Sequence, residues 1–282
     1  MPLDLSNPKI TQYKIGDKGI LCFLGGESGM GKTALGRGLI EKYGRDEVLF
    51  LDVENRLAPL AELEPYRWGN GPIEHTRQID ECIEYLRSQV TQGKPHPKVL
   101  MFDSLSEWSD LRMREVQNEI PDATKDGTFK RFRTLGETGL DLVVRVRSIP
   151  QMIKIINCTM NRRPLAEGGG YEFSLFGNIV PDNLARKVDE LFVLVERTLD
   201  PGLFSPQYNG PLKPYIGMGP VRLFQTGNYD GIAAKDSSTK LALFEPTESR
   251  PGARDGWPLL LSRINPALAP ATSGQAPQGG TE

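Results

Sequence analysis

The 282-residue sequence lacks the features that mark membrane and secreted proteins. No apolar run approaches the roughly 20 residues that a helix needs to cross a bilayer. Residues 1–6 lack the basic and apolar regions of a signal peptide. The sequence therefore predicts a cytoplasmic protein with no membrane partner.

Cysteine and net charge are also low. The three cysteines, Cys22, Cys82 and Cys158, are odd in number and far apart, so we expect buried thiols rather than a disulfide or a metal site. The net charge of −2 gives no overall attraction to nucleic acid. Residues 112–163, however, carry eleven Lys or Arg against six Asp or Glu. This stretch is either a solvated face or a basic binding surface.

What the sequence does contain is a complete phosphate-loop motif. Residues 26–33 read G-E-S-G-M-G-K-T and match the pattern G-x-x-x-x-G-K-T. An apolar run at 19–24 precedes the motif, and a helix-compatible stretch at 32–43 follows it and stops at Gly44. Glycines let backbone N–H groups surround an anion, and the helix N-terminus adds partial positive charge. A chance glycine-rich turn is the alternative, but the strand–loop–helix context predicts a nucleoside triphosphate site.

Individual positions of the motif have expected contacts. Lys32 is expected to reach the β- and γ-phosphates, and the Thr33 hydroxyl to hold Mg²⁺. The predicted nucleotide-binding residues run from the end of the strand into the helix: Gly26, Glu27, Ser28, Gly29, Met30, Gly31, Lys32, Thr33 and Ala34.

The rest of the chain alternates strand and helix patterns. Further strands are predicted at 47–53, 98–103, 151–158 and 188–196, and helices at 73–91, 104–119 and 129–148. Apolar strands without polar alternation, separated by helices, predict an α/β fold with a mainly parallel sheet covered on both faces.

Composition also suggests boundaries along the chain. We predict a leader at 1–18, a core at 19–200 and a β-rich extension at 201–265 with strands at 221–225 and 241–244. The low-complexity tail at 266–282 is expected to be disordered.

A carboxylate ends the predicted strand at 98–103. Asp103 follows four apolar residues and precedes Ser104, which is the pattern of a Walker B acid that orients the Mg²⁺ shell. Alternatively, Asp103 caps the helix that begins near Leu105. Both roles are compatible with one another.

Two further carboxylates follow the predicted strand at 47–53. Asp52 and Glu54 lie on the same side of an extended chain, at the edge where open sheets place ligands. A carboxylate at this edge can act as a general base toward the water that attacks the γ-phosphate. Acids at a strand end also cap helices or pair with neighbouring bases such as Arg56.

These motifs, in this order, resemble the ATPase core of the RecA recombinase family. The segments that carry the resemblance are the phosphate loop, residues 50–55 (FLDVEN) and residues 100–105 (LMFDSL). The resemblance covers roughly residues 19–247 and implies a RecA-type P-loop NTPase core in which Glu54 activates water and Asp103 forms the Walker B end. The single-core length and the runs at 178–183 and 233–236 look most like short, phage-encoded single-strand annealing ATPases.

The resemblance implies a function. It implies ATP and Mg²⁺ as cofactors, ATP hydrolysis stimulated by DNA, and homo-oligomeric rings or filaments on single-stranded DNA during annealing or homologous recombination. It also implies a single-strand binding protein as a partner and, for a phage-encoded chain, the host cytoplasm as its location. The absence of an Asn-Lys-x-Asp motif favours ATP over GTP. One departure is the missing glutamine that senses the γ-phosphate; in the matching stretch, Asn157 or Thr159 could donate a similar hydrogen bond.

In RecA-like proteins, two loops after the third and fourth core strands face the DNA. The equivalent segments here, residues 117–136 and 161–178, combine cations that can follow a phosphate backbone with aromatic rings that can stack on bases. The predicted DNA-binding residues are Lys130, Arg131, Arg133, Arg162, Arg163, Tyr171 and Phe173. As alternatives, Phe129 and Phe132 belong to the core, and Arg162 and Arg163 reach a neighbouring subunit's phosphates.

Two other functions stay open at this level. One is a DNA-binding or assembly protein that uses ATP as a structural ligand with little hydrolysis. The other is a P-loop phosphotransferase acting on a small molecule, with Arg162 and Arg163 in a phosphate-clamping lid.

Overall fold

The computed structural model describes residues 19–121, 125–162, 171–176, 179–228, 234–236, 238, 241–248 and 255–268. The predicted leader at 1–18 and the tail beyond residue 268 lie outside the described residues.

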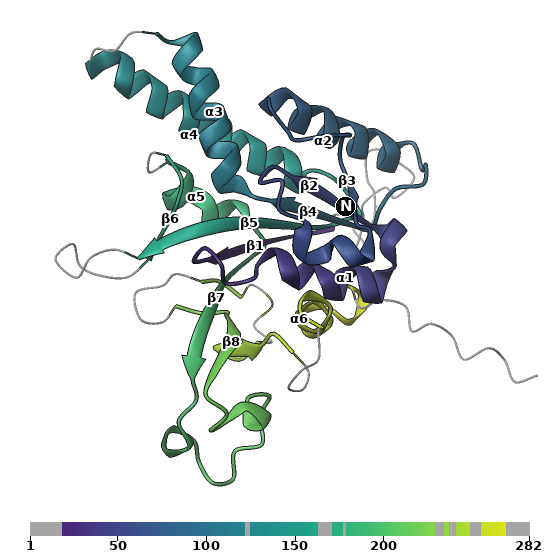
Figure 1. Cartoon of the computed structure of the whole chain (residues 1–282), viewed down its shortest axis with the longest axis vertical. Coiled ribbons are helices and arrows are strands. Elements are labelled where there is room, and N and C mark those ends of the chain that lie inside the picture. The colour runs from purple at the N-terminus through teal and green to yellow at the C-terminus, as the bar shows by residue number, and fades with distance from the viewer. Residues whose placement is uncertain are drawn as a thin grey trace, which may run out of the picture.

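A sheet of nine strands forms the centre of the described chain (Figure 1). Its order is β3-β2-β4-β5-β1-β7-β8-β9, with β6 paired to β5. The strands from β3 to β7 in this order run parallel, whereas β6, β8 and β9 are antiparallel to their neighbours. The strand bounds are β1 Ile20–Gly26, β2 Val48–Asp52, β3 Tyr66–Arg67, β4 Val99–Asp103, β5 Ile153–Arg162, β6 Tyr171–Phe173, β7 Glu190–Thr198, β8 Pro220–Gln225 and β9 Phe244–Pro246.

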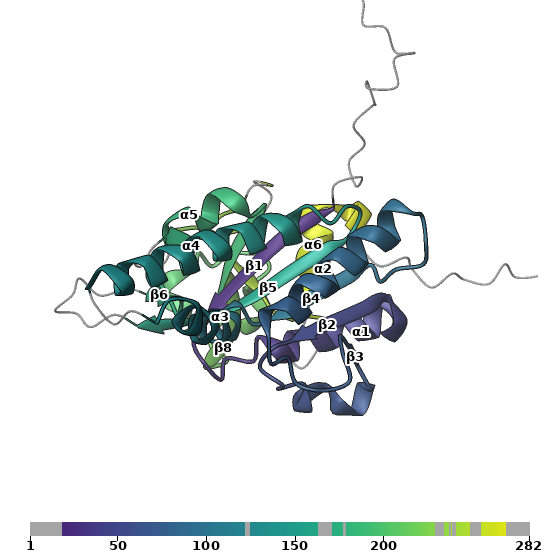
Figure 2. The same cartoon turned by 90° about the horizontal axis from the view of Figure 1, so that it is seen from above.

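Helices cover both faces of this sheet (Figures 1 and 2). On one face lie α2, α3, α4 and α5, and on the other lie α1 and α6. The helix bounds are α1 Gly36–Tyr43, α2 Thr76–Thr91, α3 Leu105–Glu119, α4 Lys125–Arg147, α5 Ile179–Lys187 and α6 Trp257–Ile264.

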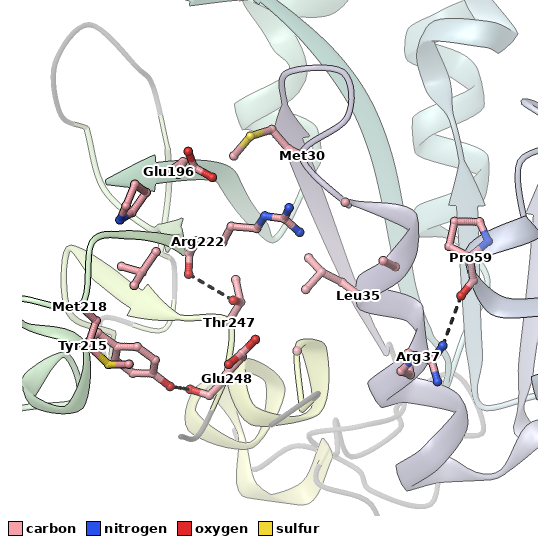
Figure 3. A pocket seen from close by; sticks show the side chains of 15 residues that line it. Met30, Leu35, Arg37, Pro59, Glu196, Tyr215, Met218, Arg222, Thr247 and Glu248 are labelled. Atoms are coloured by element: carbon pink, nitrogen blue, oxygen red, sulfur yellow. Dashed lines mark hydrogen bonds between the residues drawn. The ribbon is translucent and has the colours of Figure 1, made fainter. Parts of the chain in front are cut away.

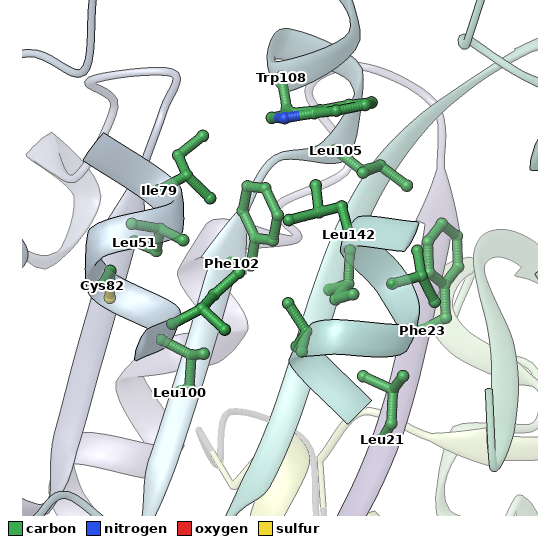
Figure 4. Packing of buried hydrophobic residues seen from close by; sticks show 14 of the residues in the cluster. Leu21, Phe23, Leu51, Ile79, Cys82, Leu100, Phe102, Leu105, Trp108 and Leu142 are labelled. Atoms are coloured by element: carbon green, nitrogen blue, oxygen red, sulfur yellow. The ribbon is translucent and has the colours of Figure 1, made fainter. Parts of the chain in front are cut away.

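The two apolar cores follow from alternation along the buried strands. In β1, Leu21 and Phe23 point into the core beneath α2 to α5 (Figure 4), whereas Cys22 and Leu24 point toward α1 and α6. Every residue of β1 is buried. This two-sided burial explains why the parallel strands read as continuous apolar runs in the sequence.

The predicted fold class is confirmed: the chain is α/β, its sheet is mainly parallel, and helices cover both faces. The three cysteines are buried and free, as expected. Two short strands, β3 and β6, were not predicted because two or three residues carry no readable pattern. The helix after the phosphate loop begins with a 3-10 turn, Thr33–Leu35, before α1.

The segment after residue 200 extends the sheet with antiparallel strands. β8 pairs with β7, and β9 pairs with β8 at 244–246 rather than at the predicted 241–244. In addition, the chain is ordered beyond the predicted start of the tail, since Pro266–Leu268 forms a 3-10 helix and the Leu268 carbonyl accepts a hydrogen bond from Tyr43. No helix in the described part of the chain is long and apolar enough to span a membrane.

Candidate nucleotide site

Four parallel strands end at the same edge of the sheet. The phosphate loop follows β1, Glu54 lies just beyond β2, Asp103 ends β4, and Asn157 lies in β5 beside Leu24 of β1. β2 and β4 pair in register, so that Asp52 lies beside Asp103. Ligands of open α/β sheets bind at this carboxyl edge.

The phosphate loop has the backbone that its glycines permit. Gly29 and Gly31 have φ values of 80° and 87°, a region that residues with a Cβ rarely adopt. Lys32 is buried, and its Nζ donates to the carbonyl oxygens of Gly26 at 2.8 Å and Glu27 at 3.0 Å. Burial lowers the pKa of Lys32, while Cys158, Glu54 and Asp103 act in the opposite direction.

Asp103 and Thr33 are in direct contact. The Thr33 hydroxyl donates to Oδ2 of Asp103, and Nδ2 of Asn157 donates to Oδ1 at 2.9 Å. Burial raises the pKa of Asp103, and these two hydrogen bonds lower it in part. The helix cap proposed for Asp103 belongs instead to Ser104, whose hydroxyl accepts the Glu107 N–H of α3.

Glu54 is fixed beside Asp103 by both backbone and side chain. The N–H of Glu54 donates to the Asp103 carbonyl at 3.2 Å, and the Ser104 hydroxyl donates to Oε1 of Glu54 at 2.6 Å. Nη1 of Arg56 lies 3.5 Å from Oε2. The Glu54 side chain is only 12% exposed, so its carboxylate lies within the site rather than in solvent.

Asp52, the other acid of this strand end, has a different role. Its Oδ1 accepts the Arg56 backbone N–H at 3.0 Å, which stabilises the turn after β2. Burial raises the pKa of Asp52. Of the two acids that the sequence left as candidates, only Glu54 is linked to Asp103 by hydrogen bonds through the Asp103–Ser104 segment.

The predicted metal ligands fit Mg²⁺. Thr33 and Asp103 supply a hydroxyl and a carboxylate in contact with each other, and Mg²⁺ takes few protein oxygens while keeping waters and phosphate oxygens as its other ligands. Within the described residues, no group of three or more His, Cys, Asp or Glu side chains could hold a metal ion without such help.

A cavity of about 640 Å³ lies beside the phosphate loop (Figure 3). Met30, Gly31 and Leu35 line it on the side of the loop and the following helix. Tyr215 and Arg222 line the opposite side. Arg222 was not predicted from the sequence; its position as the one charged residue in the predicted strand at 221–225 was the signal that could have found it.

The basic and aromatic segments also come together. Phe129, Phe132 and Phe176 are 69%, 39% and 38% exposed, so the alternative that Phe129 and Phe132 belong to the core is wrong. The rings of Phe132 and Phe176 lie 6.4 Å apart between centroids and join the first predicted DNA segment to the second. Lys130 and Arg133 are exposed on the same turns of α4. We call Phe129, Lys130, Phe132, Arg133 and Phe176 the α4 surface.

Arg131 and Phe173, two other predicted DNA-binding residues, make contacts outside the α4 surface. Nε of Arg131 donates to the Ile120 carbonyl at 2.7 Å, and Phe173 packs edge-on against buried Phe23 at 5.2 Å between centroids. Arg162 and Tyr171 pair through their backbones in the β5–β6 hairpin. Arg163 lies outside the described residues.

Among known proteins, the chain is similar to solved structures. No family model and no curated protein matches the chain. It is similar to a solved ATPase from the type III secretion system of pathogenic bacteria, with a TM-score of 0.41 and 14% identity over 62% of this chain and 51% of that chain. It is also similar to the RadB recombinase, with a TM-score of 0.39 and 12% identity over 77% of this chain and 86% of that chain. This chain thus spans about half the length of the ATPase, and neither likeness assigns an activity to it.

Proposed function

We propose that this protein binds and hydrolyses ATP with Mg²⁺ and acts as a homo-oligomer on single-stranded DNA during annealing or recombination. The observation that carries the proposal is the meeting of Lys32, Thr33, Glu54 and Asp103 at one edge of the sheet. Hydrogen bonds link Thr33 to Asp103 and Glu54 to the residue after Asp103. Three segments of the chain therefore contribute to a single site.

Each of these residues has a role that suits its position. Lys32 and the loop N–H groups bind the β- and γ-phosphates, and Thr33 and Asp103 hold the metal ion. Bound Mg²⁺ supplies charge neutralisation on the phosphate oxygens. The Glu54 carboxylate accepts a proton from the attacking water, while the Ser104 hydroxyl keeps Oε1 oriented.

The DNA part of the proposal is supported by the α4 surface. Proteins bind single-stranded DNA with exposed aromatic rings beside cations, because the rings stack on bases and the cations pair with phosphates. Three such rings are exposed here, from two segments that are distant in the sequence. This arrangement favours a surface that binds single-stranded DNA over the lid of a small-molecule phosphotransferase.

The replacement of Glu54 by Gln tests the hydrolytic role. We expect Glu54→Gln to bind an ATP analogue as the native protein does and to lose phosphate release by about 100-fold or more, because a general base commonly contributes 10²–10⁴-fold. Phosphate release with and without single-stranded DNA is the measurement. Glu84→Gln, at an exposed carboxylate on α2 that pairs with Arg87, is the matched control.

The outcomes separate the candidate functions. Turnover that is unchanged in Glu54→Gln contradicts the assignment of the base. Nucleotide binding without any native turnover favours a protein that uses ATP as a structural ligand.

A further inference from the structure

We propose that Arg222 is an additional phosphate-binding residue, which reaches the nucleotide from β8 of the same chain. This inference rests on the proposed function, since it assumes that the loop at 26–33 binds a nucleoside triphosphate. It adds a residue outside the three motifs, from a strand far along the chain.

The first observation is the proximity of Arg222 to the loop. A Cβ atom placed on Gly31 would lie only 2.8 Å from Nη1 of Arg222. Figure 3 shows the Arg222 side chain extending from its strand toward the space between Met30 and Leu35. The guanidinium therefore approaches the loop residue that directly precedes Lys32.

The second observation is that the guanidinium has no protein partner among the described residues. Its neighbour across the β7–β8 pair is Glu196, yet the two form no ion pair, and no hydrogen bond of the guanidinium is found in the described part of the chain. The other arginine of the cavity, Arg37, is paired with Glu41 and Glu62. Arg222 is thus available to a ligand, whereas Arg37 is occupied.

The third observation is the positive charge of the phosphate loop that lies beside the Arg222 guanidinium. The loop N–H groups and Lys32 already favour an anion, and a further cation beside Gly31 is repelled by Lys32 unless an anion lies between them. Arginine can bind two phosphate oxygens at once through parallel N–H···O bonds. The cavity, of about 640 Å³, gives room for a ligand that continues from the loop toward Tyr215. A phosphate chain would supply the anion between the two cations and would fit in this cavity.

Nucleotide affinity of the full-length chain tests this inference. Calorimetric titration with a non-hydrolysable ATP analogue and Mg²⁺ would compare the native protein with Arg222→Ala and Arg222→Lys. Because hydrogen bonds to charged groups are stronger than neutral ones, we expect Arg222→Ala to weaken binding about 10- to 100-fold. Arg222→Lys should restore only part of it, since lysine keeps the charge but loses the two-pronged geometry.

Two controls keep the result interpretable. Arg77→Ala removes an arginine on α2 that is 87% exposed and pairs only with Glu81 among its described neighbours, so it should leave the affinity unchanged. Thermal melting without nucleotide should give the same midpoint for native and Arg222→Ala protein, because the guanidinium contributes no ion pair to the described part of the fold.

Lys32→Ala distinguishes the two proposals. If Lys32→Ala abolishes binding while Arg222→Ala binds like the native protein, Arg222 does not contact the phosphates and this inference is overturned. The inference is also overturned if Arg222→Ala impairs only assembly, since Arg222 would then serve a second copy of the chain. If Lys32→Ala also binds normally, the proposed nucleotide site itself is wrong.

Discussion

Asp103 lies at the centre of the hydrogen bonds of the candidate site. It is 1% exposed and carries a carboxylate that burial disfavours, yet it accepts hydrogen bonds from Thr33 and Asn157. Oδ1 of Asn157 is itself buried without a partner among the described residues. The Asn157 side chain therefore orients Asp103. It lies in β5, the strand in which the resemblance to RecA leads one to expect a glutamine.

The burial of Asp103 predicts a pH-dependent cost to stability. A carboxyl group whose pKa is raised in the folded state binds protons more tightly there than in the unfolded chain. The free energy of unfolding should therefore fall as the pH rises from about 3.9, the usual unfolded pKa, through the raised folded pKa. Above that range the cost stays constant.

We expect Asp103→Asn to remove this cost. At neutral pH and without nucleotide, its melting midpoint should exceed that of the native protein by about 2–4 °C for each kcal/mol recovered, and the difference should vanish near pH 3. Thermal melts across this pH range are the measurement. Asp46→Asn, at a side chain that is 86% exposed, is the control. A melting midpoint of Asp103→Asn that lies below that of the native protein at neutral pH would show that the fold stabilises Asp103 in its charged form.

At the scale of elements, α3 and α4 extend away from the sheet side by side (Figure 1), and α4 carries four of the five residues of the α4 surface. The apolar face of α4 is buried along only part of its length. Leu135, Leu142 and Val146 face the core. Phe129 and Phe132 lie near the N-terminal end of the helix, where burial is incomplete, and they therefore stay exposed. Apolar rings that are exposed as a group, as Phe129, Phe132 and Phe176 are here, are typical of a binding surface.

The α4 surface predicts the effect of removing its rings. Phe129→Ala combined with Phe132→Ala should weaken binding to single-stranded DNA by about 5- to 150-fold at constant salt for each base that loses its stacking ring, since stacking on one base contributes about 1–3 kcal/mol. Fluorescence anisotropy of a labelled oligonucleotide is the measurement. Tyr85→Ala, at a ring on α2 that is 47% exposed, is the matched control.

The salt dependence of DNA affinity distinguishes the contribution of ring stacking from that of charge at the α4 surface. Lys130→Ala should reduce the slope of log affinity against log salt by about 0.7, the value expected for one phosphate contact on a single strand. The double phenylalanine variant should leave the slope unchanged. Equal effects of the α4 and Tyr85 substitutions would argue against this surface as the DNA site.

At the scale of the whole molecule, α6 joins the C-terminal segment to the core of the α/β fold. Trp257 is fully buried and lies 6.1 Å from Phe192 of β7 and 5.4 Å from Phe224 of β8, measured between ring centroids. It shares a core with Leu39 of α1, the helix that follows the phosphate loop. The described part of the segment after residue 200 is thus packed into the α/β core, and it includes β8 with its Arg222.

Trp257 therefore predicts a coupling between this segment and the core. Trp257→Ala should lower the free energy of unfolding by about 3–5 kcal/mol, the usual cost of deleting a large buried aromatic side chain. Trp257→Phe, which keeps an aromatic ring in the same core, should cost less. Urea denaturation followed by circular dichroism is the measurement. A loss below about 1 kcal/mol for Trp257→Ala would indicate that α6 is not part of the cooperative unit.

Features with a local signal could be predicted from the amino-acid sequence. The phosphate loop is one contiguous motif, and Glu54 and Asp103 each follow or end an apolar strand, so strand direction was enough to predict that they would lie at the same edge. Two-sided burial of parallel strands likewise left a readable pattern of apolar runs. The short β3 and β6, and the position of β9, had no such pattern and could not be predicted.

Contacts between distant segments, by contrast, became known only from the folded chain. Asn157 meets Asp103, Phe132 meets Phe176, and Arg222 approaches Gly31 because of strand order and register. No local pattern encodes these pairs, since each depends on where the chain returns after a crossover. An apolar pattern specifies which face of a strand is buried, whereas the neighbour of a side chain depends on how the whole sheet packs.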